Sequence, residues 1–126
     1  MISTTFEPGR NLYVMKISGD ITAPELVTAY DTALAHQDFR PDMHAIWDLT
    51  GLRLVSIPLG EIRKLPPGLR EYARRRGQYK AALVPGSATD RSLLRIYVTI
   101  LKLIGTNIKF RVCQSKTDAY GWIEHG

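Results

Sequence analysis

The residues of this chain that could do chemistry begin with an aspartate at the end of a predicted strand. Asp48 lies in the short apolar run 45–49, which predicts a buried strand. Open α/β sheets bind ligands beyond the carboxyl ends of their strands, so Asp48 is the first candidate for a site. Three roles are open for its carboxylate: bonding to the following loop, contact with a partner or ligand, and acid–base chemistry. His44 lies too far along the strand, about 13 Å away, to share a proton with it.

The remaining histidines and the cysteine indicate no catalytic or metal site. His36, His44 and His125 do not have the spacing of metal ligands, and Cys113 has no second cysteine to pair with. The position of Cys113 at a strand end predicts a small buried side chain. The chain has no glycine-rich phosphate loop and no Gly-x-Ser-x-Gly motif. We therefore predict a protein that is not an enzyme and that has no cofactor and no metal.

Basic residues gather in the second half of the chain. Residues 53–111 contain thirteen Lys and Arg against three acidic residues, a net charge of +10, whereas the rest carries −5. The densest part contains Arg70, Arg74 and Arg75. These cations could complement the dipole at the end of a helix that stops at Gly77, or they could bind an acidic protein, an anionic headgroup or nucleic acid. No aromatic residues alternate with the arginines, which disfavours a nucleic-acid partner.

Length and composition predict a single domain over residues 1–126. A chain of this length with 44% apolar residues can bury one core. The first twenty residues mix charged and apolar positions and do not follow the pattern of a signal peptide. The most apolar stretch contains Arg95 and Lys102, so no membrane span is predicted. We expect a cytoplasmic protein of bacterial type.

Strand patterns and helix patterns alternate along the chain. A turn with Pro and Gly separates two strand-like segments, 2–6 and 11–18, which predict an antiparallel hairpin. Further strands are expected at 45–49, 80–84 and 108–113. Helices are expected at 22–36, in two short pieces within 58–76, at 89–104, and from Ser115 to the C-terminus.

Three of the expected helices begin with a capping-box pattern, in which a hydroxyl residue precedes an acid by three positions. The pairs are Thr22 with Glu25, Ser87 with Asp90, and Ser115 with Asp118. Because a helix connects each strand after the hairpin to the next, those strands must be mostly parallel, with right-handed connections. The sequence therefore predicts an α/β domain with a mostly parallel sheet of about five strands, an N-terminal antiparallel hairpin and about four helices.

The predicted helix 89–104 has more apolar residues than one buried face can hold. Arg95 and Lys102 lie on a narrow polar stripe, and large apolar side chains, including Tyr97 and Leu101, occupy nearly every other position. This surplus must pack inside the domain, against a protein partner or a second copy, or around an apolar, lipid-like ligand. The sequence leaves these three alternatives open.

Several of these patterns together resemble the STAS and SpoIIAA-like family, whose best-known members are bacterial anti-sigma-factor antagonists. The resemblance covers residues 11–123 and is carried by the segments 17–22, 46–51, 81–84, 110–112 and 118–123. In that family a strand ending in Asp and a small hydroxyl residue leads to the partner-docking surface. Asp48, Thr50 and Gly51 match this pattern.

The resemblance implies a non-catalytic regulatory or protein-interaction domain that binds a protein partner or self-associates as a homodimer. Regulated members carry a phosphorylated serine in an Asp-Ser-Ser-Gly stretch shortly after that Asp, whereas this chain has Ser56 before Ile57 and Pro58. Ser56 is therefore either a helix N-cap or a modified residue. Members without the serine have been compared with lipid-binding folds, so a carrier or sensor of an apolar ligand is the alternative. The candidate binding residues are Asp48, Thr50, Ser56, Arg70, Arg74, Arg75, Tyr97 and Leu101.

Overall fold

The computed structural model describes residues 1–52, 79–102 and 108–126. Its strands are β1 (Ile2–Glu7), β2 (Leu12–Ser18), β3 (His44–Gly51), β4 (Tyr79–Pro85) and β5 (Ile108–Val112). Its helices are the short 3-10 helix η1 (Pro8–Arg10) and the α-helices α1 (Ala23–Leu34), α4 (Ala88–Lys102) and α5 (Lys116–His125). The five predicted strands and three of the predicted helices are confirmed. The helices predicted within 58–76 lie outside the described residues.

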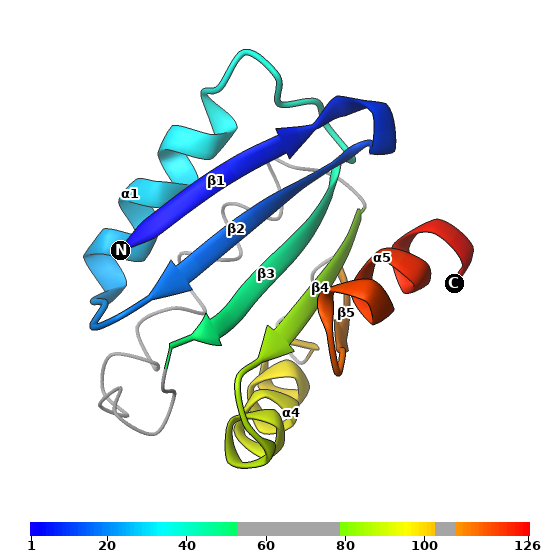
Figure 1. Ribbon diagram of the computed structural model, residues 1–126. Helices are drawn as coiled ribbons and strands as arrows, with labels where there is room; N and C mark the ends of the chain where they lie inside the picture. Colours follow the sequence, from blue (N-terminus) through cyan, green and yellow to red (C-terminus); the bar gives the residue numbers. More distant parts are fainter. Residues whose placement is uncertain (53–78, 103–107) are drawn as a thin grey trace.

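The five strands form one mixed sheet in the order β1-β2-β3-β4-β5 (Figure 1). β1 is antiparallel to β2, whereas the pairs β2–β3, β3–β4 and β4–β5 are parallel. The hairpin turns through η1 and Asn11, which adopts a left-handed conformation (φ 55°) that asparagine tolerates. The predicted α/β fold, a mostly parallel sheet with an N-terminal hairpin, is therefore confirmed.

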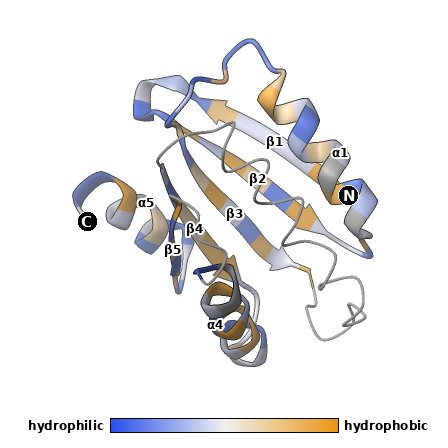
Figure 2. Ribbon diagram, turned by 180° about the vertical axis from the view of Figure 1, so that it is seen from behind, coloured by the Kyte–Doolittle hydropathy of each residue, from blue (hydrophilic) through white to orange (hydrophobic). Residues whose placement is uncertain are grey.

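The helices cover both faces of the sheet unequally. Helices α1 and α4 lie on one face (Figure 1 and Figure 2), as right-handed connections between strands that follow one another in order require. Both helices share one core cluster with Tyr13 and Met15 of β2. Helix α5 packs on the opposite face, where its Ala119 and Ile123 share a second core cluster with Leu12 and Val14 of β2. Alternate residues of the central strands are therefore buried on opposite faces, as expected for parallel strands covered on both sides.

The three predicted N-caps are all present, because each hydroxyl accepts the backbone N–H three residues later. The bonds run from Glu25 to Thr22 (3.3 Å), from Asp90 to Ser87 (3.1 Å) and from Asp118 to Ser115 (3.1 Å). In α1, Leu26, Tyr30 and Ala33 are buried at the helical spacing that the sequence predicted. The starts of the helices are therefore set by local sequence.

Polar contacts attach α5 to the sheet at two places. Lys80 of β4 donates from Nζ to the carbonyl oxygens of Trp122 (3.2 Å) and Ile123 (3.3 Å), near the helix C-terminus. The Lys80 ammonium also lies 5.5 Å from the centre of the Trp122 ring. The Tyr120 hydroxyl donates to Oε2 of Glu7, at the end of β1. These contacts fix the helix across β3 and β4.

Candidate functional site

The candidate site is the edge of the sheet where β2, β3 and β4 end. The Asp48 side chain near the end of β3 is buried, since the residue is only 5% exposed. Its Oδ1 accepts two hydrogen bonds from Thr50, one from the backbone N–H (3.1 Å) and one from the hydroxyl (2.5 Å). Thr50 is still part of β3, so these bonds fix the end of the strand; the loop beyond Leu52, to which the sequence let Asp48 bond, lies outside the described residues.

The backbones of the three strand ends approach one another closely. Gly19 donates its N–H to the carbonyl of Gly51 (3.2 Å), and a Cβ added to Gly51 would lie 2.8 Å from Cβ of Ser18. After β4, a Cβ added to Gly86 would lie 2.6 Å from the carbonyl oxygen of Thr50. Glycine is therefore required sterically at these two positions, and the strand ends form one closely fitted surface.

Small polar groups are exposed at this edge. Thr50 and Gly51 at the end of β3, and Gly86 and Ser87 after β4, are exposed to solvent. The N-termini of α1, α4 and α5 follow the ends of β2, β4 and β5, so they lie at the same edge of the sheet. The edge thus presents backbone and short side chains whose positions are fixed by neighbouring strands.

Cys113, just after β5, is kept in its thiol form. Burial first, and then the negative charge of Asp118, raise its pKa to about 11, against a smaller lowering by the charge of Arg111. The predicted burial of Cys113 is confirmed, since the residue is 1% exposed. A buried thiol with a raised pKa is a poor nucleophile.

Two tyrosines also have raised pKa values. For Tyr97 of α4 the cause is burial first and then the charge of Asp90. For Tyr120 of α5, burial and the hydrogen bond to Glu7 raise the pKa to about 12. Both phenols therefore stay protonated at neutral pH.

Of the predicted site residues, the structure brings Asp48 and Thr50 together. Tyr97 lies in α4 and is half-buried against the core cluster under α1 and α4. Leu101 also lies in α4, but its side chain is outside the described part of the structure. The remaining candidates fall outside the described residues: Ser56, Arg70, Arg74 and Arg75.

Most of the apolar α4 side chains that the structure describes pack inside the domain. Leu94 and Val98 are buried in the core cluster, and Leu93 and Tyr97 are half-buried against it. Ile96 is 56% exposed. Among the α4 side chains that the structure describes, Ile96 is thus the large apolar one left open for an external contact.

Trp47 is a notable residue that the sequence argument missed. It lies on the face of α1 and α4, opposite Asp48, with its ring centre 5.0 Å from that of Tyr30. Its indole N–H is shielded from solvent and has no hydrogen-bond partner within the described part of the chain. Because successive side chains of a strand point to opposite faces, the sequence could have placed Trp47 and Asp48 on opposite faces of the sheet.

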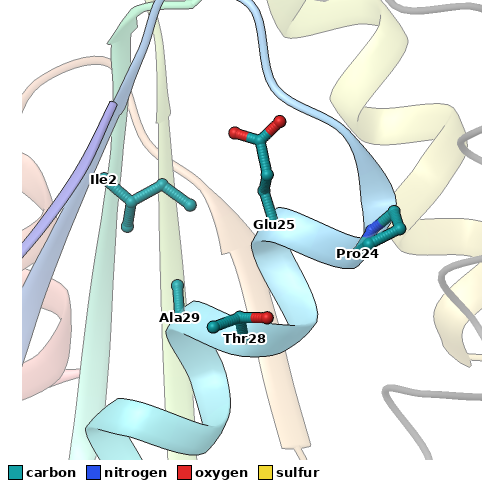
Figure 3. Close-up of a pocket in the computed structure, with 5 residues that line it drawn as sticks. All are labelled: Ile2, Pro24, Glu25, Thr28 and Ala29. Carbon is teal, nitrogen blue, oxygen red and sulfur yellow. The ribbon is translucent and has the colours of Figure 1, made fainter.

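A groove lies beside β1, at a place that the sequence did not indicate. It has a volume of about 410 Å³ and is open to solvent. Its walls are Ile2 of β1 and one flank of α1, formed by Pro24, Glu25, Thr28 and Ala29 (Figure 3). The groove joins residues more than twenty positions apart, which the sequence alone does not pair.

Comparison with known proteins adds no relative. A scan of protein-family models, a search of curated proteins and a search of solved structures gave no match. Within residues 1–52, 79–102 and 108–126, no cluster of His, Cys, Asp and Glu could hold a metal ion. No helix in the same part of the chain is long and apolar enough to cross a membrane.

Proposed function

We propose that this chain is a cytoplasmic, non-catalytic protein-interaction domain of SpoIIAA-like type, which binds a protein partner or a second copy at the edge around Asp48 and Thr50. The observation that carries this proposal is the environment of Asp48. Its buried carboxylate accepts both hydrogen bonds that Thr50 offers, so the acid fixes the end of β3. Thr50 and the following Gly51 are then presented to solvent.

The close fit of the strand ends supports this role. Association costs less when the binding surface is already ordered, because fewer side chains and loops must be immobilised. The contacts of Gly51 with Ser18 and of Gly86 with Thr50 provide such order. The groups with raised pKa values, Cys113 among them, remain neutral and are poorly suited to nucleophilic or acid–base steps at neutral pH.

Native mass spectrometry at several protein concentrations tests self-association. We expect a dimer whose fraction rises with concentration and which is lost in Thr50→Arg, since the long charged side chain would stand on the docking surface. Thr5→Arg is the matched control, because Thr5 is an exposed threonine in β1, away from this edge. A dimer that survives Thr50→Arg would reject this edge as the interface, and a monomer without bound mass would leave a different protein as the partner.

A carrier or sensor of an apolar ligand is the second candidate, and Trp47 is the observation that favours it. The Trp47 indole N–H has no acceptor among the described residues, and a buried donor left unpaired costs about 1–3 kcal/mol, which a ligand with a carbonyl group would recover. The same mass spectra test this function: a bound mass that is lost on denaturation, and reduced in Trp47→Phe, would favour the carrier over the interaction domain.

A further inference from the structure

β1 is the first strand of the sheet, and among the described strands it pairs with β2 alone. The Met1 amine donates to the carbonyl of Ser18 (2.6 Å), and the Ser18 N–H donates back to the carbonyl of Met1 (2.9 Å). In an antiparallel pair, residues that exchange both hydrogen bonds alternate with residues that exchange none. Ser3, Thr5 and Glu7 therefore direct their backbone groups to β2.

The intervening residues of β1 direct their backbone groups away from β2. The N–H and C=O groups of Ile2, Thr4 and Phe6 point to the open edge of the sheet. Outside the strand ladder, the described part of the chain makes no hydrogen bond to them. Edge strands are commonly protected by lysine, proline or a bulge. β1 has the sequence Ile-Ser-Thr-Thr-Phe-Glu and pairs with β2 in unbroken register, so it has none of these protections.

The groove lies along this open edge, and α1 forms its other side. Ile2 points from β1 toward Glu25 and Ala29 of α1 (Figure 3). At the other end of the strand, the ring of Phe6 stacks on His36, just after α1, with ring centres 4.3 Å apart. The helix therefore runs alongside the whole of β1. In a strand added to this edge, every second side chain would contact this flank of α1.

The charged residue in the groove wall favours a basic occupant. It is Glu25, whose carboxylate lies beside Ile2 at the open edge of β1 and would attract a basic side chain. A second copy of the chain would fit poorly. Pairing β1 with its counterpart through a two-fold axis would bring both α1 helices onto the same face, beside the same edge. An isolated extended segment carries no such helix.

We propose that an extended segment of a protein partner adds to β1 as a sixth strand against α1. In this segment every second residue is either basic or small and apolar. Main-chain bonds to Ile2, Thr4 and Phe6 provide the attachment, and alternate side chains meet Ala29 and Glu25 in the groove. Recognition of this kind, in which a peptide extends a sheet edge, derives affinity from main-chain hydrogen bonds and specificity from alternate side chains. The surface is separate from the edge around Asp48 and does not depend on the function proposed there.

The test uses the acetylated peptide Thr-Lys-Thr-Val-Thr-Lys-Thr at millimolar concentration and the amide spectrum of the isotope-labelled protein. We expect the amide signals of Ile2, Thr4 and Phe6 to shift, because their N–H groups gain acceptors. N-methylation of the central valine or of the threonine beside it must abolish binding at one position and leave it at the other. Equal effects at both positions, or no shifts in β1, would overturn the proposal.

Thr4 allows a matched pair of variants. Thr4→Pro removes the central outward N–H, which β2 does not use, and proline is tolerated on edge strands. Thr4→Val keeps that N–H. We expect Thr4→Pro to weaken peptide binding by about tenfold and Thr4→Val to leave it unchanged. If Thr4→Pro disturbs the fold, Ala29→Arg, which fills the groove, replaces it with Ala29→Ser as control. Peptide binding that survives both Thr4→Pro and Ala29→Arg would contradict the proposal. A variant that changes dimer formation but not peptide binding would bear on the interface proposed around Asp48 and not on β1.

Discussion

The contact between Gly86 and Thr50 leads to a sharp prediction about stability. In Gly86→Ala the new Cβ would lie 2.6 Å from the carbonyl oxygen of Thr50, well inside the usual separation of about 3.5 Å. The neighbour is backbone, so no side chain can rotate away, and the ends of β3 and β4 must move apart. Overpacking of this kind costs about 1–3 kcal/mol. The loss of freedom in the unfolded chain returns about 0.4–1 kcal/mol, so we expect a net loss of roughly 1–2 kcal/mol.

Gly121→Ala is the matched control for this substitution. Gly121 lies inside α5, and a Cβ built there meets no atom within 4 Å. Alanine should therefore stabilise the helix by about 0.5–1 kcal/mol. Urea unfolding of both variants should show a difference of roughly 2–3 kcal/mol in the free energy of unfolding, without a change in m-value. If Gly86→Ala unfolds at the same urea concentration as Gly121→Ala, the strand ends are not as closely fitted as described.

Three further predictions concern the attachment of α5 and its neighbours. Lys80→Met should lower the free energy of unfolding by about 1 kcal/mol and change Trp122 fluorescence, because the bonds to the last carbonyls of α5 are lost; an unchanged urea midpoint would contradict this. Cys113 should react with iodoacetamide at pH about 8 roughly 100-fold more slowly than in the urea-unfolded chain, and equal rates would show that its thiol is not protected. The raised pKa of Tyr120 means that its contribution to stability is complete below pH about 10 and is lost as the pH rises through about 12. Tyr120→Phe should therefore remove a step near pH 12 from the tyrosinate absorbance titration, and a titration that keeps this step would assign it to another tyrosine.

The elements of the fold could be predicted because their signals are local. The hydroxyl of Thr22 and the amide of Glu25 are three residues apart, so a helix start is written in one short stretch. The hairpin is equally local, since one turn separates β1 from β2. Within the described residues, these local capping and turn signals were sufficient to predict each strand and α-helix to within a few positions.

The candidate site could be predicted only in part. The bond between Asp48 and Thr50 spans only two residues, and both residues were candidates from the sequence. By contrast, Lys80 bonds a carbonyl 42 residues away, and Tyr120 bonds Glu7 across 113 residues. Such pairs depend on which face of the sheet each helix covers. The groove beside β1 was missed for the same reason.

The winding of the sheet also limits what Asp48 can do. In open α/β sheets, ligand crevices form where the strand order reverses and adjacent connecting helices diverge to opposite faces. Here the parallel strands follow one another in order, and both described crossover helices, α1 and α4, lie on the same face. The topology of the described residues therefore creates no such crevice at the end of β3, although an acid stands there. A carboxylate in this position is better placed to shape a surface for a macromolecule than to enclose a small ligand, and the open edge of β1 offers a second surface of the same kind.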